Sequence, residues 1–557
     1  MNPALPHAGR RALRRAIAAL VALATATTAL AAQAAGSSST GTRPRLVVVI
    51  AVDQLRADYL DRFRPYFGAR GFNLFLQHGA SFTSARYEHA VTETCPGPAV
   101  MLTGSYGMVN GIVANEWYDR TLGRPLYCAE DTTVTLVGSR ERGRSPRLLV
   151  GATVGDVLKN ETDGRSRVIT VSAKDRSAIM LGGKLADAAY WIVDSLFVTS
   201  TYYRPDLPAW VQAFNASHAL SRYVGTKWDR VLPAAAYDAV GPDDEAAEAD
   251  DDGLGRTFPH PIASVRAFDR TPFLDDLVAE FAMEAVRGES LGRDTVPDIL
   301  GVSFSATDRV GHAYGPESHE ILDDVVRLDR TLARLFAFLD RTVGLGNVVL
   351  VLTADHGVAP MPEVAARGRA DGGPRRLDPS IVDSAVSRAL TARYGAAPHP
   401  GWVVYDGAAH MTLNPAALTA KHVSLHSATR AAAEAIRKVP GVYDVLSGHD
   451  FHRLREAALV GGPASDAVRS YYPGRAGDLY YWLEPYWLPT AKSTGTEHGS
   501  PWRYDQQVPL LWYGRGIRPG VQRGPVAVAD LAPTLSALLG LTAPGGAQGR
   551  VLNEALR

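Results

Sequence analysis

A threonine in a proline-rich turn is the first candidate for chemistry in this sequence. Thr94 stands in the run Thr-Cys-Pro-Gly-Pro, and Pro96 and Pro98 stiffen the turn because they fix φ and remove backbone donors. Residues 99–102 then predict the start of a helix. A hydroxyl at a helix N-terminus faces free N–H groups and the positive end of the helix dipole, which suits a phosphate or an alkoxide. Thr-x-Pro alone, however, is more typical of an ordinary strand–turn–helix corner.

Three carboxylates and three imidazoles in other parts of the chain make a catalytic role of Thr94 the favoured interpretation. They are Asp53, Asp308, His312, Asp355, His356 and His498. Carboxylate and imidazole ligands suit zinc, and no free thiolate competes with them. A lone Asp-His-Gly is more often a turn, and a lone His is more often a core or surface residue. The six residues together predict a site for two zinc ions.

Apolar runs rich in β-branched residues predict the strands that position these groups. The runs cover residues 45–52, 167–172, 298–305, 347–353 and 508–513. Residues 321–339 predict an amphipathic helix, with Leu, Ile and Val on one face and Asp and Arg on the other. Alternating strands and helices predict an α/β fold with a mostly parallel sheet and helices on both faces. Ligands of such sheets sit beyond the carboxyl ends of the strands, where four of the five runs deliver polar residues.

The N-terminus predicts an export signal. Arg10, Arg11, Arg14 and Arg15 precede an apolar run over residues 16–32, and Ala-Gln-Ala at 32–34 offers a small-residue cleavage site. We expect a signal peptide at 1–35, a linker at 36–44 and a protein that is periplasmic or secreted. An uncleaved anchor helix is the alternative, which is disfavoured because the apolar run is short for a membrane span.

The charge of the mature chain disfavours polyanionic partners. Removing residues 1–35 takes away four of the 58 basic residues and none of the 58 acids, which leaves 54 − 58 = −4. We therefore expect no nucleic acid as a partner, and no membrane once the signal is cleaved. We also expect a monomer. Cys95 and Cys128 are the two cysteines, and in an exported chain they are a candidate disulfide whose pairing the sequence leaves open.

From residue 45 to 557 we predict one catalytic domain with two insertions, at about 195–290 and 395–490. The first insertion contains seven acids within residues 243–252. Such a run predicts a solvated, mobile loop rather than a metal site. The second insertion contains a helical piece near 425–438 and many Tyr and Trp residues between 471 and 487. We interpret both insertions as caps over the sheet rather than as separate domains.

These motifs resemble the alkaline phosphatase superfamily. Within it, the sequence is similar to the bacterial phosphate-irrepressible alkaline phosphatases with a threonine nucleophile, relatives of the type I phosphodiesterases and nucleotide pyrophosphatases. The resemblance runs from Asp53 to about Leu539 and includes the tail at 528–534, Val-Ala-Asp-Leu-Ala-Pro-Thr. It implies that one zinc is held by Asp308, His312 and His498. It implies that the other is held by Asp53, Asp355 and His356, and that this zinc also contacts the Thr94 oxygen.

The resemblance also implies how a phosphoryl group is held. Asn115 lies 21 residues after Thr94, and in this family the corresponding amide donates to a phosphoryl oxygen. Lys174 and Arg176 stand where the family places its cationic pair, and a spacing of two in an extended segment points both to one face. A phosphate monoester carries one more anionic oxygen than a diester, so two fixed cations favour the monoester.

We therefore expect an exported two-zinc alkaline phosphatase that hydrolyses small phosphate monoesters through a phosphothreonine intermediate. A phosphodiesterase or nucleotide pyrophosphatase on the same fold is the alternative. A catalytically inactive binding module is a third hypothesis, disfavoured by the complete set of ligands. A sulfatase is disfavoured because Cys95 does not begin the pattern Cys-x-Pro-x-Arg. Thr92 is disfavoured as the nucleophile because it misses the spacing to Asn115.

Overall fold

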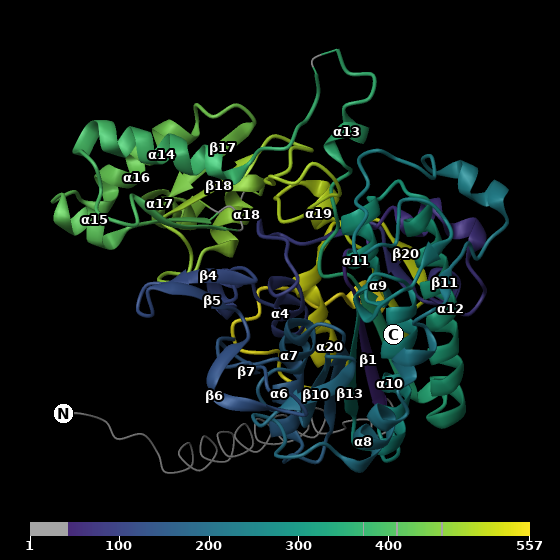
Figure 1. Ribbon diagram of the computed structural model, residues 1–557. Coiled ribbons are helices and arrows are strands. Elements are labelled where there is room, and N and C mark those ends of the chain that lie inside the picture. Colours follow the sequence, from purple (N-terminus) through teal and green to yellow (C-terminus); the bar gives the residue numbers. More distant parts are fainter. Residues whose placement is uncertain (1–42, 371, 408–409, 458–460) are drawn as a thin grey trace, which may run out of the picture. The chain divides into compact units, whose positions relative to one another are not determined.

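A sheet of eleven strands organises the part of the chain that the structure describes (Figure 1). The structure is a computed structural model that describes residues 43–370, 372–407, 410–457 and 461–557. The predicted signal peptide and most of the predicted linker lie outside these residues. Among the described residues, no helix is both long enough and apolar enough to cross a membrane.

Five neighbouring strands at the centre of the sheet run parallel. In order across the sheet they are β14 (Val348–Thr353), β1 (Leu46–Val52), β13 (Asp298–Phe304), β8 (Val168–Ser172) and β9 (Ala188–Val193). Every residue of β1, β13 and β14 is buried, as expected for apolar strands covered on both faces. The carboxyl ends of the five strands share one edge of the sheet. The predicted α/β fold with a parallel central sheet is confirmed.

The strands beside this central set run antiparallel to it. β10 (Leu196–Ser200) pairs with β9, and β19 (Leu510–Gly514) pairs with β14. β19 is the fifth predicted strand, and its first residue, Leu510, lies opposite Thr353 at the end of β14. The start of β19 therefore lies at the shared edge, so the segment that leads into this strand can also supply a site residue.

Helices cover both faces of the sheet. Figure 1 shows α10 (Phe273–Gly288) and α12 (His319–Thr342) on one face, and α4 (Pro96–Thr103), α7 (Asp175–Gly182) and α20 (Leu531–Leu539) on the other. The predicted amphipathic helix is α12, which starts after Ser318. The Ser318 hydroxyl accepts a hydrogen bond from the Ile321 N–H and so caps the helix.

The first predicted insertion, residues 195–290, is only partly separate from the sheet. It contains β10, which is a strand of the main sheet, and α10, which packs on that sheet. Between them lie α8 (Ala209–Ala216), α9 (Val265–Phe268) and a two-stranded sheet of β11 (Lys227–Trp228) and β12 (His260–Pro261).

The acidic run at 243–252 has an irregular backbone but is not a fully solvated loop. Glu245 and Glu248 are only 9% and 2% exposed. Four of the other five acids pair with arginines outside the run: Arg230 with Asp243, Arg256 with Asp244, and Arg270 with Asp251 and Asp252. The prediction of a solvated loop is therefore wrong for this run, because basic partners from elsewhere hold it against the protein.

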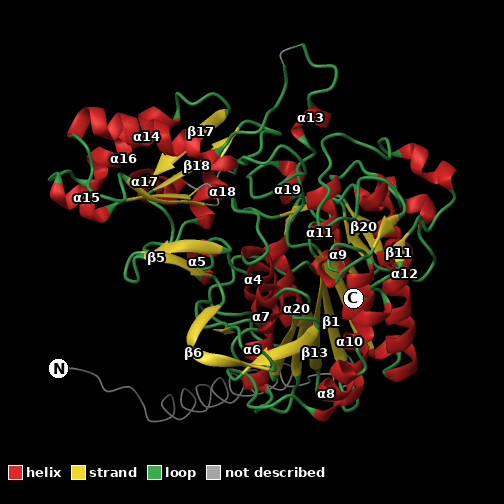
Figure 2. Cartoon of the chain, in the orientation of Figure 1, coloured by secondary structure: helices red, strands yellow, loops and turns green. Residues whose placement is uncertain are grey.

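Residues 377–487 form a second layered region with a core of its own (Figure 2). Its antiparallel sheet has the order β15 (Val403–Gly407), β16 (His410–Leu413), β18 (Leu479–Leu483) and β17 (Val442–Ser447). Helices α14 (Pro379–Tyr394) and α16 (Leu425–Ile436) pack on this sheet, and α16 corresponds to the predicted helical piece near 425–438. The region overlaps the second predicted insertion, residues 395–490.

Candidate active site

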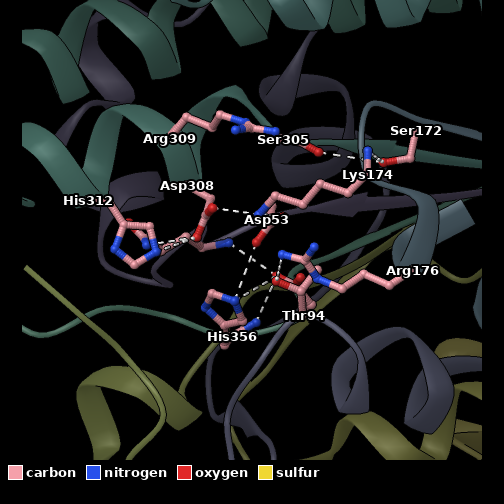
Figure 3. Close-up of polar contacts among 12 residues, drawn as sticks. Asp53, Thr94, Ser172, Lys174, Arg176, Ser305, Asp308, Arg309, His312 and His356 are labelled. Atoms are coloured by element: carbon pink, nitrogen blue, oxygen red, sulfur yellow. Dashed lines mark hydrogen bonds and ion pairs between the residues drawn. The ribbon is translucent and has the colours of Figure 1, made fainter. Parts of the chain in front are cut away.

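The predicted site residues meet beyond the carboxyl ends of the parallel strands. Asp53 directly follows β1, and Asp355 lies two residues after β14. Asp308 lies in α11 (Ala306–Tyr314), which begins after a single residue that follows β13. Figure 3 shows the side chains of Asp53, Asp308 and His356 pointing toward one another. The shared edge of the sheet therefore collects acids that are up to 302 residues apart, since 355 − 53 = 302.

A first group of possible metal ligands consists of Asp308, His312 and His498, whose ligand atoms all lie within 4.8 Å of one another. Asp308 and His312 share one face of α11 because they are four residues apart. The Nδ1 atoms of His312 and His498 lie 2.8 Å and 2.7 Å from the carbonyl oxygens of Thr496 and Thr92. A carbonyl only accepts hydrogen bonds, so both Nδ1 atoms act as donors. Both Nε2 atoms then carry a lone pair that can bind a metal.

A second group consists of Asp53, Asp308 and His356. Asp53 Oδ1 lies 3.3 Å from His356 Nε2, and His356 Nδ1 lies 2.9 Å from the Gly357 carbonyl oxygen. Asp355 adjoins this group, with its Oδ1 atom 3.8 Å from His356 Nε2. The Asp355 Oδ2 atom has no hydrogen-bond partner among the described residues. The structure thus places Asp308 in both groups, whereas the family resemblance implies that it belongs to one.

Three buried carboxylates give this edge of the sheet a surplus of negative charge. Burial, together with the charge of Asp53, raises the pKa of Asp355 to about 8. Burial acts against protonation of His356, but the carboxylates of Asp355 and Asp53 outweigh it and raise the pKa of His356 to about 10. Lys174 supplies one positive charge, with Nζ 2.6 Å from Asp53 Oδ2 and 2.5 Å from Asp308 Oδ2. Buried acids of this kind, with imidazole neighbours, can hold metal ions.

Thr94 is buried and precedes Cys95, the N-cap residue of α4. Its hydroxyl accepts a hydrogen bond of 3.4 Å from Arg176 Nη2, and Figure 3 shows the two side chains together. Asn115 holds both sides of this turn. Its Oδ1 accepts a hydrogen bond from Cys95 N–H, and its own N–H donates to Glu93 Oε2. The Nδ2 group of Asn115 remains as its donor toward a ligand.

The cationic pair comes from the end of β8, but not in the expected conformation. Lys174 is extended, whereas α7 begins at Asp175, so Arg176 lies in the first turn of a helix. The expectation of an extended segment over 174–176 is therefore wrong. Lys174 faces the carboxylates and Arg176 faces Thr94. Asp175 fixes this corner, because its carboxylate accepts hydrogen bonds from Tyr127 and Arg144.

A disulfide between Cys95 and Cys128 ties the turn at Thr94 to a neighbouring hairpin. The hairpin consists of β4 (Glu116–Asp119) and β5 (Arg124–Tyr127), which lie between Asn115 and Cys128. The Cys128 N–H donates to the Asn115 carbonyl oxygen across the base of the hairpin. The candidate bridge is therefore present, and it holds Asn115 beside Thr94.

Sequence reasoning missed two residues that contact this site. Glu93 accepts the Asn115 N–H, and Gln54 donates to Asp308 and Asp355. Both are direct neighbours of predicted site residues, since Glu93 precedes Thr94 and Gln54 follows Asp53. Adjacency was the one signal for them in the sequence, and it does not tell which way a side chain points.

Comparisons with known proteins agree with this arrangement. Residues 47–506 match the family model described as type I phosphodiesterase / nucleotide pyrophosphatase. The alkaline phosphatase PhoV of Synechococcus elongatus is 34% identical to this chain, with 93% of this chain and 94% of PhoV covered. A protein of Myroides odoratus named as a calcium-transporting ATPase is 32% identical, with 92% of this chain and 95% of its own length covered.

Among solved structures, wild-type alkaline phosphatase PafA matches with a TM-score of 0.86 at 32% identity. The match covers 92% of this chain and 99% of PafA. A mutant structure of PafA replaces a threonine, an asparagine, a lysine and an arginine. In that protein the first two are 21 residues apart and the last two are two residues apart.

Proposed function

Because the chain belongs to the type I phosphodiesterase / nucleotide pyrophosphatase family, within the alkaline phosphatase superfamily, we propose that it is an alkaline phosphatase. Its substrates are small phosphate monoesters. One observation carries this proposal: the Thr94 hydroxyl lies beside Arg176, in a turn whose Thr92 carbonyl oxygen is 2.7 Å from Nδ1 of the ligand candidate His498. A nucleophile, an anion-binding cation and a metal-binding donor set are the parts that phosphoryl transfer needs.

The donor set fits two zinc ions. Asp308, His312 and His498 would hold one, and Asp53, Asp355 and His356 would hold the other. Such ions, when bound, supply Lewis acidity to the oxygens that enter and leave phosphorus. Two features support this assignment: the buried Asp355 Oδ2 atom, which has no hydrogen-bond partner in the described part of the chain, and the two Nε2 lone pairs of the first group.

The residues of the chain provide the covalent chemistry. Thr94 Oγ attacks phosphorus, a bond from Oγ to phosphorus forms, and the bond from phosphorus to the ester oxygen breaks as the alcohol leaves. Water then attacks phosphorus, the Oγ–phosphorus bond breaks, and inorganic phosphate and free Thr94 result. Arg176, whose Nη2 lies 3.4 Å from Oγ, is placed to bind an anionic oxygen of the phosphoryl group that Thr94 attacks. The Asn115 amide and Lys174 bind the other phosphoryl oxygens.

The mutant of PafA supports the choice of these four residues. Thr94 and Asn115 are 115 − 94 = 21 residues apart, and Lys174 and Arg176 are two apart, as are the four residues replaced in that structure. The ATPase name of the Myroides odoratus relative is compatible with the same chemistry, because cleavage of a terminal phosphoryl group is an in-line displacement at phosphorus as well.

Phosphodiester hydrolysis is the second candidate, because the family model that matches the chain is named for it. A diester has an ester group where a monoester has an anionic oxygen, so the two cationic side chains should discriminate between them. We expect Lys174→Ala and Arg176→Ala to lower kcat/KM for an aryl phosphate by about 100-fold each. The loss for a methyl aryl phosphate should be several-fold smaller. Equal losses on both substrates would contradict the preference for monoesters.

The nucleophile is tested by Thr94→Ala and Thr94→Ser. Thr94→Ala should reduce turnover to the level of a blank reaction, whereas Thr94→Ser keeps a hydroxyl and should retain a measurable fraction. Intact-protein mass spectrometry after an acid quench should show a phosphoryl adduct on the wild type and none on Thr94→Ala. Metal analysis of the purified protein should give two zinc ions per chain. Wild-type turnover without any adduct or zinc would refute the proposal.

Export and domain organisation complete the proposal. The signal peptide at 1–35, the linker at 36–44 and a single catalytic domain at 45–557 follow from the sequence. The protein would then act in the periplasm or outside the cell as a monomer. N-terminal sequencing of the protein recovered from the periplasm, together with its mass in solution, tests these points.

A further inference from the structure

We propose that Gln54 is a positioning residue, which fixes the carboxylate of Asp308 between the two groups of metal ligands. Gln54 is fully buried and directly follows Asp53. Its Nε2 group donates to Asp308 Oδ1 at 3.0 Å, and its backbone N–H donates to Asp355 Oδ1 at 3.1 Å. One residue at the end of β1 thus contacts acids that follow both neighbouring strands, β13 and β14. The inference rests on the two-metal site of the proposed function.

The orientation of Asp308 matters more than that of any other acid at the site, because Asp308 belongs to both ligand groups. Its Oδ1 atom lies 3.2 Å from His312 Nε2 and 3.7 Å from His498 Nε2, while Oδ2 faces Lys174. A carboxylate on the first turn of a helix can rotate about its side-chain bonds. A donor that holds one of its oxygens restricts this rotation, and partners of this kind commonly tune metal affinity.

The backbone of Gln54 also indicates a constrained position. Its φ of +66° lies in the left-handed region, which residues other than glycine rarely adopt. The conformation is held from both sides, since Asp53 N–H donates to the Phe304 carbonyl and Leu55 N–H donates to the Val52 carbonyl. Left-handed residues of this kind cluster at functional sites, where the surrounding structure fixes them. Here the turn brings the Gln54 side chain to Asp308.

Gly311 provides the space that this side chain occupies. Gly311 lies on α11 between Asp308 and His312, and a Cβ atom at this position would overlap Gln54 Oε1. Gln54 Oε1 has no hydrogen-bond partner among the described residues. Its amide is therefore held by the donor end alone, with Nε2 directed at a carboxylate that can only accept. A side chain at 311 would push the amide away from Asp308.

This geometry defines three test variants and a control. Gln54→Ala removes the donor, Gln54→Glu replaces it with a second carboxylate facing Asp308, and Gly311→Ala displaces it without changing a ligand. Gln506→Ala is the control, because Gln506, like Gln54, is a buried glutamine. Its Nε2 group makes two hydrogen bonds. Its acceptors, the His89 carbonyl and Asp466, are not predicted ligands.

Zinc affinity is measured by competition with a chromophoric chelator, beside kcat and KM on an aryl phosphate. We expect Gln54→Ala and Gly311→Ala to weaken binding of zinc by about 10- to 100-fold. Gln54→Glu should lower kcat further than Gln54→Ala at saturating zinc. KM should change less than kcat in all three. Gln506→Ala should lower the melting temperature but leave zinc affinity within about twofold of the wild type.

Two results would overturn the inference. One is a Gln54→Ala protein that binds zinc as tightly as the wild type, while the wild type itself binds two ions and turns over. The other is a loss of affinity in Gln506→Ala as large as that in Gln54→Ala, since Gln54 would then act through general stability. A wild-type chain that neither binds zinc nor hydrolyses the ester would instead refute the proposed function, and this inference with it.

Discussion

The candidate metal ligands and the candidate nucleophile reach the same site on two different kinds of structure. Asp53, Asp308 and Asp355 follow three neighbouring parallel strands whose hydrogen bonds fix their spacing. Thr94 and Asn115 lie instead on a turn and at the base of a hairpin, joined by a disulfide and by side-chain hydrogen bonds. We refer to these as the ligand side and the nucleophile side.

The comparison indicates where each half of the site gets its rigidity. The ligand side is continuous with the main hydrophobic core, because β1, β13 and β14 are buried along their whole length. The nucleophile side packs in a separate apolar cluster that includes Cys95, Cys128 and Trp482 of β18. Changes on the ligand side should therefore act through the metals. Changes on the nucleophile side should act through the placement of Thr94.

The largest effect should come from the ligand side, at Asp308. Asp308→Ala removes a donor from both ligand groups, so we expect a loss in kcat/KM of more than about 1,000-fold, beyond that of a single anion-stabilising donor. Zinc content, measured on the same preparation, should fall from two ions per chain. A matched control is Asp329→Ala, because the Asp329 carboxylate accepts hydrogen bonds from the N–H groups of Gly68 and Phe72, neither of which is a predicted ligand. That variant should lose stability but keep its zinc, and retention of zinc by Asp308→Ala would contradict the assignment.

A smaller effect is expected on the nucleophile side, at the disulfide. In Cys95→Ser/Cys128→Ser the covalent link between the hairpin that carries Asn115 and the turn of Thr94 is lost, and hydrogen bonds alone join them. A displacement of about 1 Å at a reacting group can cost about 100-fold, so we expect kcat to fall by about 10- to 100-fold. Zinc content should not change. The free energy of unfolding should fall by about 2–4 kcal/mol, as is typical for loss of a native disulfide. Denaturation in urea and metal analysis provide these measurements.

The comparison would fail if the double serine variant lost zinc in proportion to its activity, because the two sides would then be one unit. Reduction of the wild type under non-denaturing conditions offers a second approach. Reduced protein that regains full kcat only after reoxidation would agree with a positioning role for the bridge. Reduced protein with unchanged kcat would contradict it.

The ligand side and the nucleophile side also differ in how well the sequence predicts them, because strand ends follow a local pattern and long-range contacts do not. A buried apolar strand with a polar residue at its end is a local pattern, so Asp53, Asp308 and Asp355 could be predicted with the strands that carry them. The start of α7 at Asp175 could not be predicted, because the short segment that follows a strand is compatible with both an extended and a helical conformation. The left-handed backbone of Gln54 depends on hydrogen bonds to Phe304 of β13 and to Asp355, which follows β14, and no local pattern encodes these contacts.

The same reason explains the acidic run and the edges of the sheet. Residues 243–252 read as a solvated loop, because their partners Arg230 and Arg270 lie outside the run. The sequence also places β10 in an insertion, because nothing in a strand's own residues marks its antiparallel pairing with a strand of the main sheet. Long-range pairing thus decides what the local pattern leaves open, including the burial of charge.

The smallest effect, and one that leaves the reacting groups untouched, is the pH dependence of stability. On the nucleophile side, burial, together with the charge of His356, lowers the pKa of His89 to about 3. On the ligand side, burial raises the pKa of Asp324 to about 7, against a hydrogen bond from the Thr307 hydroxyl. Between about pH 6.5 and 3, His89 is protonated in the unfolded state but not in the folded state, so its effect makes the free energy of unfolding fall as the pH falls.

Between about pH 3.8 and 7, Asp324 is protonated in the folded state but not in the unfolded state, so its effect makes the free energy of unfolding fall as the pH rises.

The two slopes have opposite signs and overlap between about pH 4 and 6.5, where each amounts to at most about 1.4 kcal/mol per pH unit. In His89→Phe, which keeps a flat ring against Tyr87, stability should therefore fall more steeply with rising pH than in the wild type. In Asp324→Asn it should rise more steeply. Urea denaturation at pH 4.5, 5.5 and 6.5 gives each variant's difference from the wild type, in which other titrating groups cancel. The prediction would be contradicted if both variants changed the pH slope of the free energy of unfolding in the same direction relative to the wild type.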